Sequence, residues 1–246
     1  MKLALLGTTG YHPNAIRHTS CYMLPEQGIV FDAGTGMFRL PQFLQTDTLD
    51  IFLSHSHLDH VVGLSYLLGL LYGREMRRVT IHGEAEKLQA VKDHIYAPLI
   101  FPVAPDWEFR PLAASPFACG DAQVSWFPLQ HPGGSVGFRL DWPDRSLAYV
   151  TDTTAKTDSP YIEAVSDVDL LLHECNFPDS LADFAKPTGH SFTSAVAKLA
   201  QTARVKKLLL THLMPSSPEV DPVGLNTARA IFPATEIAED EAVVEF

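Results

Sequence analysis

The stretch Ser54–His60, "SHSHLDH", follows directly on the apolar run "LDIFL" at positions 49–53. It places three histidines and one aspartate within six positions, namely His55, His57, Asp59 and His60. Imidazoles packed this densely would repel one another if protonated, and their nitrogens would be costly to bury unpaired. Zinc binds imidazole nitrogen and carboxylate oxygen, and a catalytic zinc keeps one position open for water. The stretch therefore predicts a catalytic metal centre.

Other metal-binding residue types stand where further predicted strands end. "WFPLQH", "LAYVTD" and "LLLTH" end in His131, Asp152 and His212. Each residue alone would be an ordinary hydrogen-bonded histidine or turn aspartate, but their shared placement favours one rim at which strands present ligands. His55 and His57 alternate along an extended loop and so bind one ion, while Asp59 and His60 bind a second. The predicted assignment is His55, His57 and His131 on one ion, Asp59, His60 and His212 on the other, and Asp152 bridging both.

Composition limits the class of protein. The chain has 246 residues, of which 46% are hydrophobic, and no low-complexity linker divides it, which predicts a single domain over 1–246. The net charge of −11 argues against a broad basic surface for long nucleic acids.

No apolar run reaches the length of a membrane span, and the N-terminal run is too short for a secretory signal. Cys21, Cys119 and Cys175 are too few and too scattered for a disulfide framework, so we expect buried thiols in a cytoplasmic protein.

Hydrophobic patterning predicts a chain of strands separated by helices. Helices are expected at 36–44, 61–73, 84–99, 159–166, 190–203 and 221–232, the fifth of them capped by Ser191. The helix at 61–73 is apolar nearly all round and should be buried against a sheet. Strands are expected at 2–7, 20–25, 28–34, 49–55, 78–83, 107–112, 122–131, 135–143, 146–153, 169–177, 205–213 and 242–246. The pattern suits two sheets packed face to face with helices outside.

"HSHLDH" matches the H-x-H-x-D-H signature of the metallo-β-lactamase superfamily, and His131, Asp152 and His212 follow in that superfamily's order. The resemblance implies an αββα sandwich of two packed mixed β-sheets flanked by helices, with a two-metal site at one edge. Within the superfamily the chain most resembles ribonuclease Z-like phosphodiesterases. This likeness is carried by "LGTTGYHPNAIRHTSCYML", "GIVFDAGTG", "LLLHECNF" and "GHSFTSAVAKLAQTARVKKLLLTHL".

The resemblance also implies roles for residues around the metals. The counterpart of His190 protonates the leaving oxygen, and it is held by an acidic residue in a stretch matching His173–Glu174; Asp59 counts as catalytic as well as a metal ligand. The alternatives are a local cap for His190 and a surface charge for Glu174.

In the loop "YHPNAIRH", Arg17 and His18 are candidate substrate-binding residues, Arg17 for a phosphate, although a capped turn explains the loop equally well. Gly34 and Gly36 should let the backbone pass close beneath the metals, and Asp32 should support a ligand histidine.

The ligand set predicts a two-metal hydrolase, and departures from relatives disfavour an iron oxygen-reductase and a β-lactamase. Flavodiiron proteins carry glutamate where this chain has His57, and true β-lactamases lack a bridging aspartate like Asp152. Such a hydrolase holds hydroxide between its ions and clamps the phosphoryl oxygens during attack. The imidazole-rich ligand set favours zinc, with manganese or iron as alternatives.

The substrate is predicted to be a small cyclic or linear phosphodiester. Ribonuclease Z binds tRNA with a flexible basic arm, and no such insertion is visible in this sequence. The segment at 175–190 is short and not basic. Nucleic acid is thereby disfavoured, and ribonuclease Z-like tRNA 3′-processing remains the alternative, together with a thioesterase-type hydrolase and a non-catalytic metal-binding ligand sensor. Dimers are common among the resembled phosphodiesterases, which suggests a homodimer.

Overall fold

The computed structural model describes residues 1–103, 105–113, 115–217 and 219–246. The chain divides into two compact units, which we call unit 1 (Met1–Ala113 with Glu239–Glu245) and unit 2 (Ala114–Ala238 with Phe246). Within the described residues, each unit holds one seven-stranded sheet. The single domain over 1–246 stays a prediction.

The sheet of unit 1 has the strand order β14-β1-β2-β3-β4-β5-β6. Its strands are β1 (Lys2–Gly7), β2 (Cys21–Leu24), β3 (Ile29–Phe31), β4 (Thr48–Phe52), β5 (Arg78–Gly83), β6 (Glu108–Pro111) and β14 (Val243–Glu245). β3 to β6 run parallel, and the other pairs are antiparallel. The helical segments are η1 (Thr35–Arg39), α1 (Leu40–Phe43), α2 (Leu58–Val61), η2 (Val62–Tyr66), α3 (Leu67–Leu70), α4 (Ala85–Ala90) and η3 (Val91–Ile95).

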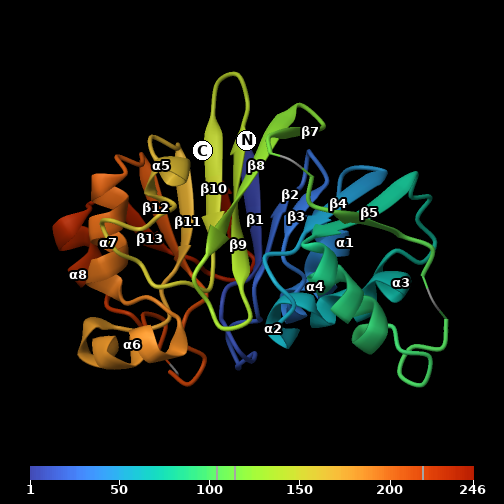
Figure 1. Cartoon of the computed structure of the whole chain (residues 1–246), viewed down its shortest axis with the longest axis horizontal. Helices are drawn as coiled ribbons and strands as arrows, with labels where there is room; N and C mark the ends of the chain where they lie inside the picture. The colour runs from blue at the N-terminus through green and yellow to red at the C-terminus, as the bar shows by residue number, and fades with distance from the viewer. Residues whose placement is uncertain (104, 114, 218) are drawn as a thin grey trace. The chain divides into compact units, whose positions relative to one another are not determined.

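The core of unit 1 lies between this sheet and its helices. Successive residues of a strand point to opposite faces, so Leu49 and Ile51 of β4 share the core face while Asp50 points away from it. Leu64 of η2 and Leu88 of α4 pack into the same cluster. Figure 1 shows α3 and α4 beside β4 and β5. The sheet thus holds the ends of β3 and β4 in fixed positions.

The sheet of unit 2 has the strand order β13-β12-β11-β10-β9-β8-β7. Its strands are β7 (Phe117–Cys119), β8 (Ala122–Leu129), β9 (Ser135–Asp141), β10 (Ser146–Val150), β11 (Leu170–Glu174), β12 (Lys207–Thr211) and β13 (Thr235–Ile237). β10 to β13 run parallel, and because β9 is antiparallel to both β8 and β10, β8 also runs with them. The helical segments are α5 (Ile162–Val165), η4 (Asp179–Leu181), α6 (Ala182–Thr188), α7 (Thr193–Thr202) and α8 (Leu225–Ile231).

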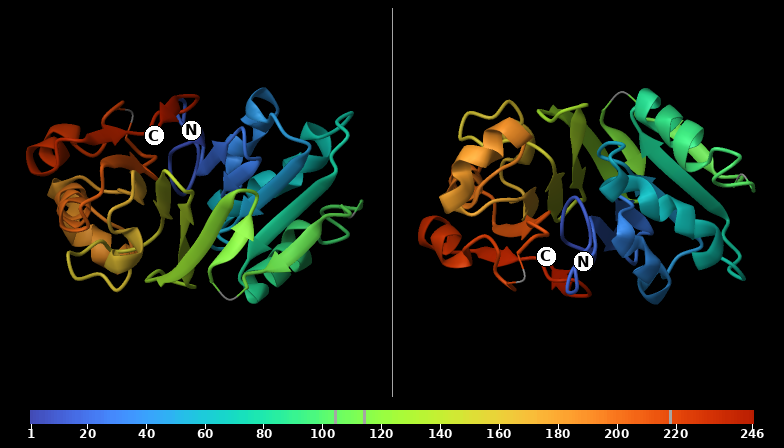
Figure 2. Two further views of the ribbon diagram at one scale, coloured as in Figure 1. Left: turned by 90° about the horizontal axis from the view of Figure 1, so that it is seen from above. Right: turned by 90° about the horizontal axis from the view of Figure 1, so that it is seen from below.

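The core of unit 2 is built on its central parallel strands. Every residue of β10 and β11 is buried, as expected for strands covered on both faces. Val196, Leu199 and Ala200 of α7 complete this core. Figure 1 shows α7 and α8 next to each other beside β11 to β13, and Figure 2 gives two further views of these elements.

Three differences from the sequence prediction concern secondary structure. The expected helix at 61–73 is broken into α2, η2 and α3, and Leu68 and Tyr72 are 38% and 90% exposed, so it is not buried all round. Gly63 lies so close to the backbone of Gly34 that an added Cβ would be 2.3 Å from the Gly34 oxygen, and the chain is 3-10 helical there. The segment at 84–99 divides into the α-helix α4 and the π-helical segment η3. Patterning also missed β7, β13 and α6.

The cysteines are buried and free, as predicted. Burial raises the pKa of the Cys21 and Cys175 thiols, which keeps both protonated and unreactive. Of the helices in the described residues, none is long and apolar enough to cross a membrane.

Candidate metal centre

The strands of unit 2 bring their polar ends to one edge of the sheet. β8, β10, β11 and β12 run in the same direction, so their carboxyl ends lie together. His131, Asp152 and His212 follow β8, β10 and β12, and Glu174 ends β11. The predicted rim of strand-end residues is therefore present within unit 2.

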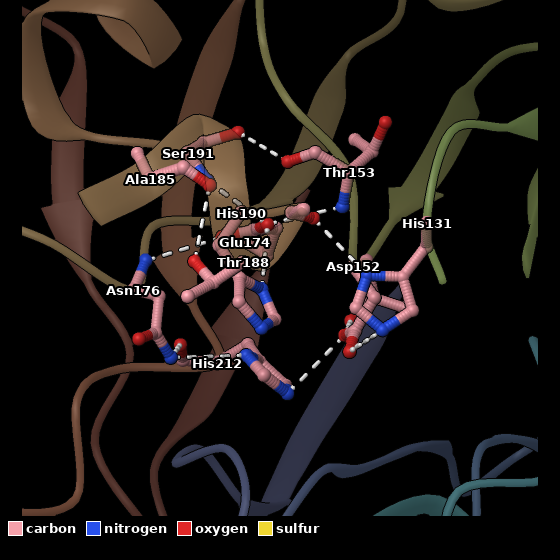
Figure 3. Close-up of polar contacts among 12 residues, drawn as sticks. His131, Asp152, Thr153, Glu174, Asn176, Ala185, Thr188, His190, Ser191 and His212 are labelled. Carbon is pink, nitrogen blue, oxygen red and sulfur yellow. Dashed lines mark hydrogen bonds and ion pairs between the residues drawn. The ribbon is translucent and has the colours of Figure 1, made fainter. Parts of the chain in front are cut away.

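Asp152 lies between two histidines. One carboxylate oxygen, Oδ2, is 3.4 Å from Nε2 of His131, and the other, Oδ1, is 3.2 Å from Nε2 of His212 (Figure 3). Thr151 Oγ1 donates a hydrogen bond of 2.6 Å to Oδ1. Asp152 is 2% exposed, so its charge is well shielded from solvent. This is the arrangement that a bridging carboxylate requires, with one oxygen turned to each imidazole.

These separations fit a divalent metal. Two donors that each lie about 2.1 Å from a zinc ion at the tetrahedral angle are about 3.4 Å apart. The two N–O distances at Asp152, 3.4 and 3.2 Å, match that value. His190 joins Asp152 and His212, with one potential ligand atom from each residue lying within 4.8 Å of the others. The donor set of unit 2 is thus suited to metal ions.

Hydrogen bonds orient the histidines for this role. His131 Nδ1 donates to the carbonyl of Gly189 at 3.1 Å, which leaves Nε2 as the unprotonated nitrogen facing Asp152. Gly189 adopts a φ of +75°, and a Cβ there would lie 2.9 Å from His131 Nδ1 and 2.6 Å from the Pro132 ring. Asn176 Nδ2 donates to the carbonyl of His212 at 3.2 Å and so anchors that residue. Gly189 and Asn176 hold candidate ligands in place and were not singled out from the sequence.

Glu174 is buried and accepts several hydrogen bonds. The alternative that it is a surface charge is therefore wrong. Glu174 is 0% exposed, and Oε1 accepts from His190 Nδ1 at 3.1 Å and from the backbone N–H groups of Thr153 and Ser191 at 3.0 and 3.1 Å (Figure 3). Oε2 accepts from the backbone N–H of Asn176 at 3.1 Å. The His190 ring lies 5.1 and 5.3 Å from the rings of His131 and His212, centroid to centroid. The predicted His190–Glu174 pair is thus present, with the imidazole beside two candidate ligands.

The prediction that Ser191 caps α7 is wrong. α7 begins at Thr193 after Phe192, with no side-chain cap. Ser191 Oγ instead donates to the carbonyl of Thr153 at 2.7 Å and accepts from the N–H of Ala155 at 2.8 Å. The serine therefore ties the segment after β10 to the segment that carries His190, a long-range contact that a local capping rule does not anticipate.

His173 contacts the backbone of Glu174. Its Nδ1 donates to the carbonyl of Glu174 at 2.7 Å, so Nε2 accepts from the hydroxyl of Tyr161 at 2.9 Å. Burial lowers the pKa of His173, which is consistent with this neutral form. His173 therefore fixes the backbone of Glu174.

The histidine cluster lies in unit 1, where β4 ends. His60 is fully buried and its Nδ1 donates to Asp32 Oδ2 at 2.7 Å, which confirms the support expected from Asp32. Ser54 binds both oxygens of Asp32 and contacts His55 Nδ1 at 2.9 Å. In both histidines Nδ1 is engaged, so Nε2 is the nitrogen available for a metal.

Asp59 and His57 complete the cluster of unit 1. Asp59 Oδ2 is 3.3 Å from Nε2 of His60, again the separation of two donors sharing one ion. The ring of His57, which is exposed, lies 4.4 Å from that of His55. A Cβ on Gly34 would meet the Asp59 carbonyl at 2.3 Å, so glycine is required for the close approach that the sequence suggested.

The loop before β2 contacts this cluster through a residue that the sequence did not single out. The backbone N–H of Tyr11 donates to Asp59 Oδ2 at 2.7 Å. Arg17 is only 4% exposed, and His18 contacts Thr35 Oγ1 through Nδ1 at 3.2 Å. Burial and the Arg39 charge lower the pKa of His18. The substrate contacts proposed for Arg17 and His18 stay predictions.

Candidate ligands and the supporting Asp32 include three residues with left-handed backbones. The φ angles of Asp32, Asp152 and His212 are +55°, +46° and +49°. Residues with a side chain rarely adopt this conformation, and such strain concentrates at functional sites. The surrounding hydrogen bonds hold the three residues in place.

A polar pocket of about 200 Å³ adjoins the rim of unit 2. Its lining includes Gln130 and Thr153, the sequence neighbours of His131 and Asp152, together with Lys156, Asp158 and Tyr161. One cation and one carboxylate lie among neutral hydrogen-bonding groups. The pocket has the size and polarity for a small organic group.

Comparison with known proteins gives the family. The family described as β-lactamase superfamily domain matches residues 27–213. Ribonuclease BN of Escherichia coli O6:K15:H31 (strain 536 / UPEC) is 28% identical over an alignment of 318 residues covering 99% of each chain. Ribonuclease Z of Acaryochloris marina (strain MBIC 11017) is 29% identical, with 98% of this chain and 96% of the relative covered.

Solved structures show the same fold. The metallo-β-lactamase fold protein YhfI from Bacillus subtilis has a TM-score of 0.80 at 21% identity, with 99% of each chain covered. The short form of human tRNase Z has a TM-score of 0.78 at 23% identity, with 100% of this chain and 99% of that chain covered. The predicted fold class and the prediction of a hydrolytic enzyme are confirmed. The chain belongs to the β-lactamase superfamily and has the metallo-β-lactamase fold.

Proposed function

We propose that the chain is a phosphodiesterase that uses two divalent metal ions, most favourably zinc. The proposed ligands are His55, His57 and His131 for one ion and Asp59, His60 and His212 for the other, with Asp152 shared. The observation that carries the proposal is Asp152, whose two oxygens face the Nε2 atoms of two different histidines. A structural zinc closed by four ligands would not need a carboxylate turned to two imidazoles.

The chemistry divides between the ions and the chain. When bound, the ions would supply Lewis-acid activation of water and of the phosphoryl oxygens. The proposed proton donor to the leaving oxygen is His190, and the hydrogen bond from its Nδ1 to Glu174 supports this role because it fixes the orientation of the imidazole. Glu174 also accepts hydrogen bonds from the N–H groups of Thr153 and Ser191. These bonds hold His190 in a fixed position relative to the segment that follows Asp152.

A small cyclic or linear phosphodiester is the proposed substrate. The net charge is −11, with 18 basic residues against 29 acidic ones, whereas affinity for RNA comes largely from basic side chains on backbone phosphates. The alignment with ribonuclease BN extends over 318 residues while this chain has 246, so the relative carries segments that this chain lacks. The pocket of about 200 Å³ beside Thr153 suits a small ester group.

RNA 3′-processing is the second candidate function. It is supported by the relatives that bear the names ribonuclease BN and ribonuclease Z. The two candidates differ in the size of the substrate and in the dependence of its binding on salt.

A side-by-side assay tests the proposal with cyclic nucleotides, bis(p-nitrophenyl) phosphate, a tRNA precursor and a thioester. We expect hydrolysis of the small esters that chelator abolishes and that varies little between low and physiological salt. Efficient, strongly salt-dependent trimming of the tRNA with weak activity on the small esters would favour the second candidate. Cleavage of a thioester alone would indicate a thioesterase, and no cleavage by the metal-loaded protein would indicate a ligand sensor.

A further inference from the structure

Tyr11 presents an exposed aromatic ring next to the histidine cluster. Its backbone N–H donates to Asp59 Oδ2 at 2.7 Å, so the residue is joined directly to a proposed metal ligand. Its side chain is 81% exposed, and the nearest aromatic group is the imidazole of His12, at 5.5 Å between ring centroids. An exposed phenol ring is therefore carried by a residue whose backbone is bonded to Asp59.

The backbone of Tyr11 is unfavourable for a residue with a side chain. Its φ is +59°, in the left-handed region that glycine adopts without cost. Gly10 stands immediately before it, yet it is Tyr11 that takes this conformation. Because the ring is exposed, little packing energy offsets the backbone cost. Folding alone does not account for an aromatic residue at this position.

The loop that carries Tyr11 is well anchored. Thr9 N–H donates to the His18 carbonyl at 3.0 Å, and Asn14 Oδ1 accepts from the N–H groups of Ile16 and Arg17 at 2.9 and 2.8 Å. The N–H of His18 donates to Asp240 Oδ2 at 2.7 Å. These bonds fix both ends of the loop, so the ring projects from a defined base.

We propose that the Tyr11 ring is a stacking surface for the planar heterocyclic base of the ester substrate, which makes nucleoside phosphodiesters the preferred class. This inference rests on the proposed function and extends it from the phosphoryl group to the organic group. Exposed aromatic rings bind nucleobases by stacking, and this mode accepts any base. If the phosphoryl group binds at Asp59, the base is only one ribose away from it. Tyr11, which is bonded to Asp59, is then near enough to contact the base.

Two esters that differ only in the base test this assignment. Adenosine 2′,3′-cyclic phosphate and methyl ribofuranoside 2′,3′-cyclic phosphate carry the same reacting group, and only the first can stack. The variants are Tyr11→Leu, which removes the aromatic ring, and Tyr11→Phe, which keeps it. Tyr72→Leu is the matched control, because Tyr72 is 90% exposed and lies in another segment.

For Tyr11→Leu we expect kcat/KM to fall about ten- to a hundredfold with the adenosine ester, mainly through KM, and to stay unchanged with the riboside. Tyr11→Phe and Tyr72→Leu should match the wild type with both esters. An equal fall with both esters, or no fall with either, would overturn the assignment. If the wild type cleaves neither ester, the proposed function fails, and calorimetric titration with adenosine 5′-monophosphate and ribose 5-phosphate tests Tyr11 separately. Tighter binding of the nucleotide that Tyr11→Leu abolishes supports stacking, and equal binding in both proteins contradicts it.

Discussion

His190 is the residue whose role in the chemistry is most open to direct test. In His190→Ala the proposed proton donor is lost while the proposed metal ligands remain, so turnover should fall by about two to four orders of magnitude. Metal content should stay that of the wild type. His94→Ala is the control, since His94 is an exposed histidine on another segment.

The alternative for His190 is a ligand role, because it lies with Asp152 and His212 in one group of possible donors. Loss of metal in proportion to the loss of turnover would assign His190 to that role. Parallel measurement of metal content and turnover on the same preparation separates the two roles.

Among single residues, the sequence predicted the candidate ligands and the supporting carboxylates of Asp32 and Glu174, but it did not predict the contacts of Asn176 and Gly189. His131, Asp152 and His212 are marked by their position after apolar strands, a local signal. Asn176 and Gly189 act through bonds to residues 36 and 58 positions away, which depend on the folded chain. The left-handed backbones of Asp152 and His212 could not be predicted either, because aspartate and histidine adopt this conformation more often than most residues but still in only a small minority of cases.

Among the elements, the passage of the chain from β3 into η1 is a close-packed crossing. In Gly34→Ala the new methyl group would lie 2.3 Å from the Asp59 carbonyl and must push α2 or η1 aside. We expect a loss of about 1–3 kcal/mol in the free energy of unfolding, as for overpacking, together with reduced metal content. Chemical denaturation and metal analysis provide the measurements.

Gly69→Ala is the matched control for this substitution. Nothing lies within 4 Å of a Cβ built on Gly69, which is in α3, so alanine should be neutral or slightly stabilising there. Equal behaviour of the two variants would show that the crossing at Gly34 is not tight.

Strands β4 and β5 share a buried ion pair that predicts acid sensitivity. Burial raises the pKa of Asp50, but hydrogen bonds from His82 and Arg78 outweigh it and lower the pKa from 3.8 to about 2. A lowered carboxyl pKa stabilises the fold above the unfolded value, and this contribution is lost as pH falls from about 4 to about 2. Allowing for screening of the partly exposed Arg78, it amounts to about 1–2 kcal/mol.

Asp50→Asn tests this pair. The variant should be less stable than the wild type at pH 7, and the difference should narrow as pH falls towards 2. Urea unfolding at a series of pH values, with both proteins in the same metal state, measures the difference. A difference that stays constant across this range would remove Asp50 from the acid response.

Element prediction succeeded where hydrophobic patterning was strong. β1 and β5 were placed at their observed ends because apolar runs there are bounded by turn residues. β7 and β13 are only three residues long, so no alternation can be read from them. The apolar run at 61–73 indicated one buried helix, but the close approach of Gly63 to Gly34 imposes a break that only the folded chain reveals.

For the whole molecule, one heptapeptide determined most of what the sequence could predict. "SHSHLDH" at Ser54–His60 led to the superfamily, and the family match over residues 27–213 confirmed it. The division into two compact units was not predicted, because no linker or change in composition marks residue 113. The motif also does not predict the substrate, because it contains candidate metal ligands and no residue proposed to bind the organic group.

The proposed function requires that one chain holds two catalytic metal ions. Elemental analysis of protein purified without chelator measures this most directly, with activity on bis(p-nitrophenyl) phosphate recorded before and after metal removal. We expect about two divalent ions per chain and diesterase activity that is lost with the metals and restored by zinc. Fewer than one ion per chain in fully folded, fully active protein would contradict it.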